Sequence, residues 1–299
     1  MSTDRTVYGS RTVKRARRTK AQLAELDNAI VHAVAEEHPV TVRGVFYRVS
    51  SAGAVAKTEN GYRAIGRRLL ALRRNRRIPY NWITDGTRWV TKPNTHRDVH
   101  TMLNDAAASY RKMLWHDQHV AVHLFTEKEA ISGTILPITN QWDVPLGILR
   151  GYTSESFAYN MAQEIAKTGK PTFIYQLGDH DPSGVDAWRD FQRKVQGFLV
   201  EEEGDDSEEK VHFERIAVTE QQIDELNLPT RPTKRSDSRA PGFGGQSVEV
   251  DAIPATTLRQ LVHDAIVQHL DEHAYRITRE AEESEQNLLA RIVKGGWSQ

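Results

Sequence analysis

Two groups of acidic residues, separated by a full strand–helix unit of sequence, are the features of this chain best suited to chemistry. Glu127 stands in the sequence Thr-Glu-Lys-Glu-Ala, and Asp179 and Asp181 stand in Gly-Asp-His-Asp-Pro-Ser-Gly. Three carboxylates that converge supply the hard oxygen ligands that Mg²⁺ prefers, and phosphate oxygens and water complete its coordination. The residue types therefore predict a magnesium site that acts on a phosphoryl group.

A plainer interpretation fits the second group taken alone. An acidic residue after a strand can cap a helix, and the sequence Asp181-Pro182-Ser183-Gly184 is typical of a turn. A single group of this kind favours the turn. The presence of Glu127 after a separate strand favours the metal site, because two strand ends then carry carboxylates.

The elements that position these residues are predicted from apolar runs. Strands are expected at residues 120–125, 146–149, 171–177 and 211–218, with helices at about 128–138, 155–167 and 184–199. This alternation is typical of a parallel sheet in an α/β fold. Open α/β sheets bind ligands at the carboxyl ends of their strands, so Glu127, Asp179 and Asp181 are expected to meet there.

Composition excludes several classes of protein. The chain has 299 residues, which is enough for two domains, and no cysteine, so disulfides and thiolate metal sites are excluded. No apolar stretch approaches the roughly 20 residues that a membrane span requires, and the N-terminus lacks the apolar core of a signal peptide. A soluble, cytoplasmic (nucleoid-associated) protein without a membrane partner is expected.

The net charge of zero hides an asymmetry. Residues 1–118 carry 22 Lys and Arg against 10 Asp and Glu, whereas the remainder carries 18 against 30. The densest basic run consists of Arg63, Arg67, Arg68, Arg73, Arg74, Arg76 and Arg77. The planar guanidinium suits phosphate, so this run predicts double-stranded DNA binding beside an acidic metal-binding part. A solvated basic surface is the alternative.

The chain divides into four predicted parts. Residues 1–19 are a basic disordered arm, residues 20–95 a winged-helix DNA-binding domain, residues 96–118 a connecting helix, and residues 119–299 the metal-binding domain. The winged-helix prediction rests on helices at 21–37, from Thr41 onward and at about 59–74, followed by a hairpin at 78–90 with Asp85-Gly86 as its turn.

The end of the chain is expected to mix loops and helices. Residues 201–209 are expected to form an acidic loop, and residues 231–245 to be mobile without a partner. Helices are expected at 98–114 within the connector, at 258–270, and from there to about Ile292.

The acidic pattern resembles a known domain. Glu127 followed by Asp179-x-Asp181 and Gly184 is similar to the Toprim domain of topoisomerases, primases and nucleases. The surrounding sequences look most like the A subunit of DNA topoisomerase VI and its meiotic double-strand-break relative, and best resemble the free-standing "mini-A" proteins. The resemblance spans about residues 20–295. It implies a winged helix followed by a Toprim domain that binds one or two Mg²⁺ ions.

A tyrosine follows the same resemblance. Residues 41–47 are similar to the family's Arg-x-x-(aromatic)-Tyr motif, which implies that Tyr47 attacks DNA to form a 5′-phosphotyrosine link while Arg43 holds the phosphate. The two positions share a helix face. A phenol with an ordinary pKa of about 10 needs such help at neutral pH. The alternative is that Tyr47 is a core aromatic residue.

The resemblance implies further roles. Glu127 would also exchange a proton with the 3′-oxygen, and Lys128 and Arg150 are further candidates for phosphate contacts. Residues 247–253 look like the family's late acidic strand, so Glu249 or Asp251 is expected near the metals, unless it caps a helix.

The resemblance also implies partners. The family's tyrosine and metal sites belong to different protomers, so a homodimer is implied. No glycine-rich phosphate loop is visible, so no ATP site is expected in this chain, and ATP-dependent strand passage would need a separate ATPase subunit.

Two other classes of function remain open. One is a Toprim nuclease like that of Wadjet-type anti-plasmid systems, in which water attacks and no covalent intermediate forms. The other is a non-catalytic DNA-binding protein with a structural ion. The complete set of Glu127, Asp179 and Asp181 weighs against this class, because none of the acidic residues of the pattern is missing.

Overall fold

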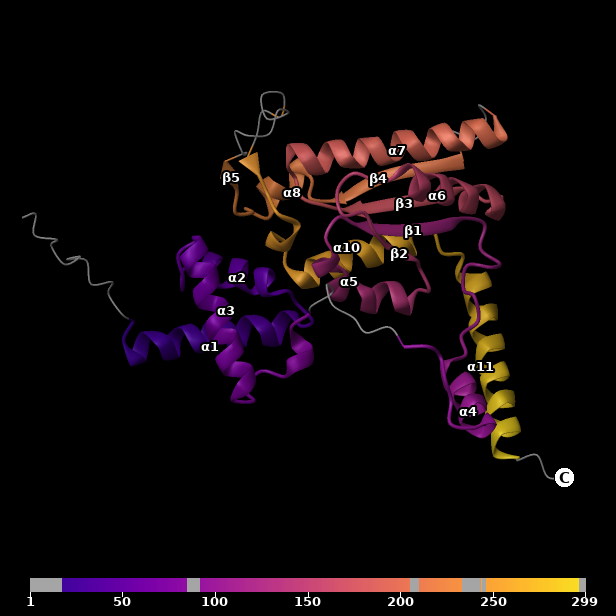
Figure 1. The fold of residues 1–299 in the computed structure, drawn as a ribbon, viewed down its shortest axis with the longest axis horizontal. Coiled ribbons are helices and arrows are strands. Elements are labelled where there is room, and N and C mark those ends of the chain that lie inside the picture. The colour runs from indigo at the N-terminus through magenta and orange to yellow at the C-terminus, as the bar shows by residue number, and fades with distance from the viewer. Residues whose placement is uncertain (1–17, 85–91, 205–209, 233–242, 244–245, 296–299) are drawn as a thin grey trace, which may run out of the picture.

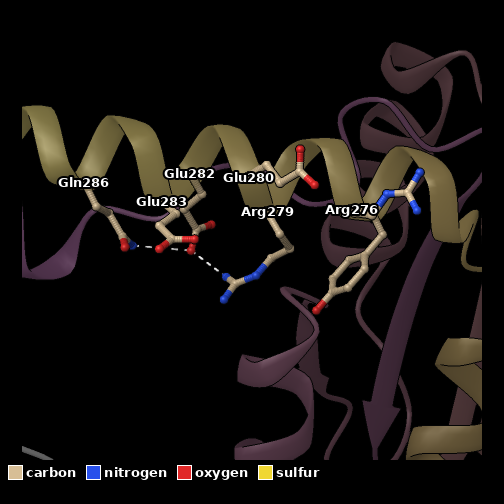
Figure 2. A pocket seen from close by; sticks show the side chains of 7 residues that line it. Arg276, Arg279, Glu280, Glu282, Glu283 and Gln286 are labelled. Atoms are coloured by element: carbon tan, nitrogen blue, oxygen red, sulfur yellow. Dashed lines mark hydrogen bonds and ion pairs between the residues drawn. The ribbon is translucent and has the colours of Figure 1, made fainter.

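A four-stranded parallel sheet organises the larger part of the chain (Figure 1). The computed structural model describes residues 18–84, 92–204, 210–232, 243 and 246–295. The strands are β1 (Ala121–Thr126), β2 (Leu146–Ile148), β3 (Thr172–Leu177) and β4 (Val211–Ala217), in the order β2-β1-β3-β4. The expected strands and the α/β class with a parallel sheet are therefore confirmed.

The connections create a switch point between β1 and β3. From β1 the chain passes through α5 (Glu129–Gln141) to β2 at the sheet edge, and α6 (Glu155–Thr168) then returns it to β3 on the other side of β1. α7 (Pro182–Glu203) leads from β3 to β4. Open sheets bind ligands where the strand order reverses in this way, so the ends of β1 and β3 form the favoured edge.

Helices cover both faces of the sheet because alternate strand residues are apolar on both sides. Phe125 and Ile174 pack with Trp188 and Phe191 beneath α6 and α7. Leu124 and Leu177 pack on the other face, where α5 and α10 (Ala255–Val267) lie (Figure 1). Burial on both faces fixes the register of the central strands, and with it the position of the residues that follow them.

Three helices form the N-terminal part. α1 (Lys20–Glu37), α2 (Val42–Ser51) and α3 (Glu59–Arg74) each begin after a threonine whose side chain accepts a backbone N–H, namely Thr19, Thr41 and Thr58. Their apolar faces share one core that includes Leu26, Ile30, Val45, Ile65 and Leu69. The three predicted helices are confirmed.

The predicted strand at residues 78–84 is wrong. These residues form a 3-10 helix, η1 (Tyr80–Trp82), and a single bridge between Ile83 and Val40. Trp82 stacks on His38 with 4.3 Å between ring centroids, and Ile78 is buried in the helical core. The apolar side chains of residues 78–84 are thus anchored to the helices. The Asp85-Gly86 turn, like most of the basic arm, lies outside the described residues.

Three other boundaries differ from expectation. The connecting helix, α4 (Val99–Ser109), ends early because the following segment bonds to α11 (Glu272–Lys294), with the Lys112 N–H 2.9 Å from Glu282 Oε2. Residues 201–203, assigned to an acidic loop, belong to the last turn of α7. Arg231–Pro232, assigned to a mobile segment, forms β5, which pairs with β6 (Gln246–Ser247).

The remaining elements are short. α8 (Glu220–Glu225) follows β4, and η3 (Val250–Ala252) follows β6. The expected acidic strand at 247–253 is therefore mostly a 3-10 turn. In the described part of the chain, no helix combines the length and apolar character that a bilayer crossing requires.

Candidate functional site

The three predicted carboxylates come together at the ends of β1 and β3. These strands are neighbours, with Thr126 opposite Leu177, so the residues that follow them are adjacent. The Asp179 N–H donates to Glu127 Oε2 at 3.0 Å. Asp181 caps α7, and its Oδ1 accepts the Gly184 N–H at 2.8 Å. Asp181 is thus a helix cap, as the plainer interpretation had it, and it also lies beside the other acidic residues.

A glycine keeps the turn close around Glu127. A Cβ atom added at Gly184 would lie 2.8 Å from Glu127 Oε2 and 2.8 Å from the Asp179 carbonyl oxygen. Both distances are too short for real Cβ contacts, so a side chain at this position would push the turn away. The glycine therefore allows the start of α7 to approach the carboxylate of the neighbouring strand.

The electrostatics of this group favour a cation. Burial raises the pKa of Glu127, and the negative charges of Asp179 and Asp181 raise it further. Burial also raises the pKa of Asp179, against the opposing effect of Lys128. Neighbouring carboxylates in a poorly solvated site repel one another, and a divalent ion with oxygen preference would relieve that repulsion.

The donor chemistry of the group fits Mg²⁺, but its arrangement is not that of a closed metal site. Among the described residues, no three acidic or histidine side chains are grouped as metal ligands. Both carboxylate oxygens of Asp179 are already engaged, since Oδ1 accepts the Val250 N–H at 3.0 Å and Oδ2 lies 2.9 Å from Lys128 Nζ. Asp179 would join an ion once Lys128 moves aside.

Lys128 is a cation that three carboxylates of the site share. Its Nζ lies 2.9 Å from Asp179 Oδ2, 3.2 Å from Asp251 Oδ2 and 3.5 Å from Glu249 Oε2. Burial lowers the pKa of Lys128, but the charges of Asp251, Asp179 and Glu249 outweigh burial and leave its pKa raised. Lys128 is therefore charged at neutral pH. It was expected to contact phosphate, and here it is held by carboxylates.

Glu249 links the helical part of the chain to this edge. Its side chain is 3 % exposed, and Arg43 Nη1 lies 2.8 Å from Oε1 and 2.6 Å from Oε2. Arg231 also pairs with Oε1. Burial raises the pKa of Glu249, but Lys128 and Arg43 lower it more, so the net shift is downward. Glu249 is thus ionised and forms ion pairs with Arg43, Arg231 and Lys128.

A second contact fixes the same junction. Thr41 Oγ1 donates to Asp251 Oδ1 at 2.7 Å and also accepts the Gly44 N–H at 2.8 Å, so the cap of α2 is bonded to η3. Asp251 and Glu249 were expected close to Asp179, and Lys128 connects all three. The capping alternative does not describe Glu249, whose side chain makes no cap hydrogen bond to η3.

Tyr47 is both a core residue and a neighbour of the charged group. It is 6 % exposed, and its ring lies 5.5 Å from that of Phe46. Burial raises the pKa of Tyr47 to about 12, Glu249 adds to the rise, and Arg43, Arg231 and Lys128 oppose it. The resting site therefore holds a neutral phenol.

Arg43 is engaged elsewhere than expected. Its guanidinium pairs with Glu249 and lies 5.1 Å from the ring centroid of Tyr62, rather than being left open for phosphate. Tyr62, in turn, packs edge-on against Phe46. Nη1 of Arg43 would bind a phosphate oxygen by exchanging Glu249 for it.

The predicted DNA-binding arginines divide into two groups. Arg68 Nε lies 2.7 Å from Asp27 Oδ1, and Arg73 stacks 4.4 Å from the Tyr80 ring centroid, so both are half-buried anchors of the fold. The exposed members are Arg63, Arg67, Arg74, Arg76 and Arg77. Arg150, the other expected phosphate contact, pairs with Glu129 at 2.9 Å.

Sequence reasoning missed Arg215 on β4. One of its Nη atoms donates to the Asp179 carbonyl oxygen, and Nε donates to the Val218 carbonyl oxygen at 3.3 Å. Its Nη1 is buried without a partner among the described residues, as is Oε1 of Gln176, which lies opposite it in the sheet. Arg215 lies two residues after Phe213 and four after Val211, so the alternation of β4 places it on their partly buried face, and this signal could have identified it.

Comparison with models of known protein families finds no match to this chain, and comparison with curated protein sequences finds none either. The geometry of the site therefore carries the functional argument.

Proposed function

We propose that this protein cleaves double-stranded DNA in a Mg²⁺-dependent transesterification, with Tyr47 as the nucleophile. One observation carries the proposal. The ion pairs Arg43–Glu249, Glu249–Lys128 and Lys128–Asp179 connect the surroundings of Tyr47 to the carboxylates at the sheet edge. The residues that the family resemblance singled out thus belong to one charged group, although they come from distant parts of the sequence.

The proposed reaction assigns a role to each residue. Tyr47 Oη attacks phosphorus, its proton passes to a nearby carboxylate, and the bond from phosphorus to the 3′-oxygen breaks, which leaves a 5′-phosphotyrosine. Glu127 returns a proton to the 3′-oxygen. Glu127, Asp179 and Asp181 would hold Mg²⁺, which when bound neutralises charge on the phosphate and the leaving oxygen. Arg43 would exchange Glu249 for a phosphate oxygen.

The partners remain part of the proposal. A homodimer would cut both strands, and a separate ATPase subunit would be needed for strand passage. The contact between Thr41 and Asp251 brings Tyr47 towards Glu249 within one chain. A composite site between protomers would therefore require the helical part to leave this position.

A second candidate is a metal-dependent nuclease in which water attacks the phosphate. The burial of Tyr47, and the rise of its pKa to about 12, favour this candidate because they disfavour the phenolate. In this reaction Tyr47 packs against Phe46 and carries no covalent link.

A denaturing gel of protein incubated with 3′-end-labelled DNA and Mg²⁺ separates the transesterase from the nuclease, because a 5′-phosphotyrosine link retains the piece that carries the 3′ end. Wild type, Tyr47→Phe and Asp179→Asn are compared, with Tyr80→Phe as a control because Tyr80 is 57 % exposed on η1. Label retained on wild type and Tyr80→Phe, and lost in the other two, supports transesterification. Cleavage that persists in Tyr47→Phe without retained label supports the nuclease. Absence of cleavage under all conditions contradicts both.

A further inference from the structure

A cavity of about 390 Å³ lies between the helical part of the chain and the start of α5. Its polar lining includes Thr41, Arg43, Tyr62, Arg73, Thr84 and Lys128. Three of its lining residues are cations, and Asp251 is its single carboxylate. The volume is near the lower end of the range for ligand sites, roughly 300–1,000 Å³. The cavity is thus small and mainly cationic.

Arg73 lines this cavity, and its guanidinium is incompletely paired among the described residues. Its Nη2 donates to the Tyr80 carbonyl oxygen at 3.1 Å, and its guanidinium lies against the Tyr80 ring. Its Nε is buried and has no hydrogen-bond partner among the described residues. Because Nε has almost no accessible surface, a ligand would meet the guanidinium through its other atoms, where an anion would pair with a half-buried charge. The stacked ring holds the guanidinium in place for that ligand.

The start of α5 adds to the same preference. Ala130, in the first turn, lines the cavity, and the N-cap residue Lys128 provides no side-chain cap to this helix. The first N–H groups of a helix lack partners within it and carry partial positive charge, which favours an anion. Arg43 and Lys128 are already paired with Glu249, Asp179 and Asp251, so Arg73 is the cation of the cavity whose pairing is incomplete.

We propose that this cavity binds a phosphate group, with Arg73 as its principal ligand. The identity of the carrier, a phosphodiester of the DNA backbone, rests on the proposed function, whereas the anion site itself does not. Because Arg43 and Lys128 line the cavity and also belong to the charged group near Tyr47, a phosphate bound here would sit beside the reacting one. The site would therefore set the position of the strand before cleavage.

The test is a calorimetric titration of the full chain with inorganic phosphate in the absence of divalent metal. Arg73→Gln is expected to weaken binding at least about tenfold, because it removes a charged donor. Arg74→Gln is the matched control, since Arg74 is the next residue, is exposed and does not line the cavity. It should stay within about twofold of wild type, an effect expected of a distant surface charge.

Two further measurements complete the test. Arg73→Lys keeps the charge but lacks the planar guanidinium, so it should fall between wild type and Arg73→Gln, and thermal melts of each variant check that it is folded. Equal weakening by Arg73→Gln and Arg74→Gln, or no saturable binding by wild type, overturns the site. Phosphate binding by a wild-type protein that does not cut DNA would leave the site standing and overturn the proposed function instead.

Discussion

Arg43 and Glu249 join the helical part of the protein to the edge of its sheet. They are 206 positions apart in the sequence, yet Arg43 Nη1 approaches the Glu249 carboxylate oxygens to 2.8 and 2.6 Å. Glu249 is buried and also forms ion pairs with Arg231 and Lys128. The Glu249 carboxylate therefore links the residues around Tyr47 to the acidic residues at the edge of the sheet.

Replacement of Glu249 by Gln should destabilise the protein. The change leaves three cations around a neutral amide, and loss of charged hydrogen bonds in a buried site costs about 2–3 kcal/mol. Urea unfolding followed by tryptophan fluorescence measures the loss. Glu59→Gln, which removes an exposed pair with Arg63, serves as control and should stay within about 0.5 kcal/mol. Equal losses in the two variants would contradict the central role of Glu249.

Lys128→Met should destabilise the protein in a pH-dependent way. Without Lys128, the buried carboxylates of Asp179 and Glu249 lose a neutralising charge, and their folded-state pKa values rise. Folding then takes up protons, so the variant loses stability as the pH rises. The deficit against wild type should be larger at about pH 7 than at about pH 5 by urea unfolding. A deficit that does not change with pH would show that Lys128 acts by packing alone.

Tyr47 should ionise late. Its folded-state pKa of about 12 lies above the ordinary value of 10.0, so the folded protein favours the neutral phenol. The stability that this gives is complete below the unfolded pKa and is lost as the pH rises from about 10 to about 12. Spectrophotometric titration of wild type and Tyr47→Phe isolates the residue by difference, which excludes the contribution of Tyr175, also buried with a pKa of about 12. A difference spectrum that titrates near the ordinary value would contradict the burial of Tyr47.

Asp181→Asn should weaken Mg²⁺ binding with little loss of stability. Asparagine preserves the N-cap of α7, where Oδ1 accepts the Gly184 N–H, but it removes a negative charge beside Glu127. The Mg²⁺ concentration needed for half-maximal thermal stabilisation should rise at least about tenfold. Asp190→Asn, on the same helix and paired with Lys194, is the control and should leave that concentration unchanged. The same Mg²⁺ dependence in wild type, Asp181→Asn and Asp190→Asn would show that Asp181 is not a Mg²⁺ ligand.

The arginines of α3 should differ in what they do. Arg67→Gln should reduce the salt dependence of DNA binding by about one counterion, because Arg67 is exposed. Arg68→Gln should instead lower the midpoint of unfolding, because Arg68 bonds to Asp27. Arg189→Gln, an exposed change on α7, is the control for both. Binding isotherms over a range of salt concentrations check the first expectation, and urea unfolding checks the second.

Sequence patterns predicted an element correctly where the period of its apolar residues, or a capping residue at its start, indicated it. The strands before Glu127 and Asp179 are mainly apolar, and Thr41 before the helical period of Val42, Val45, Phe46 and Val49 marks the start of α2. The failure at residues 78–84 has a definite cause. Ile78, Trp82 and Ile83 precede the Asp85-Gly86 turn signal that predicted a hairpin, but they pack against the helical core instead. Short apolar segments take their conformation from what they pack against, which local spacing does not encode.

The sequence by itself determined that Glu127, Asp179 and Asp181 lie at one edge of the protein, because parallel strands in a βαβ arrangement end on the same side of their sheet. It also determined that Arg43 and Tyr47 share a helix face. Only the tertiary structure decided that Glu249 holds Arg43 and Arg231, that Lys128 joins Asp179 to Glu249, and that Arg215 supports the Asp179 turn. These pairings depend on how distant elements dock. Any cation attracts any carboxylate, so the sequence does not indicate which ones pair, and packing decides it by bringing particular side chains together.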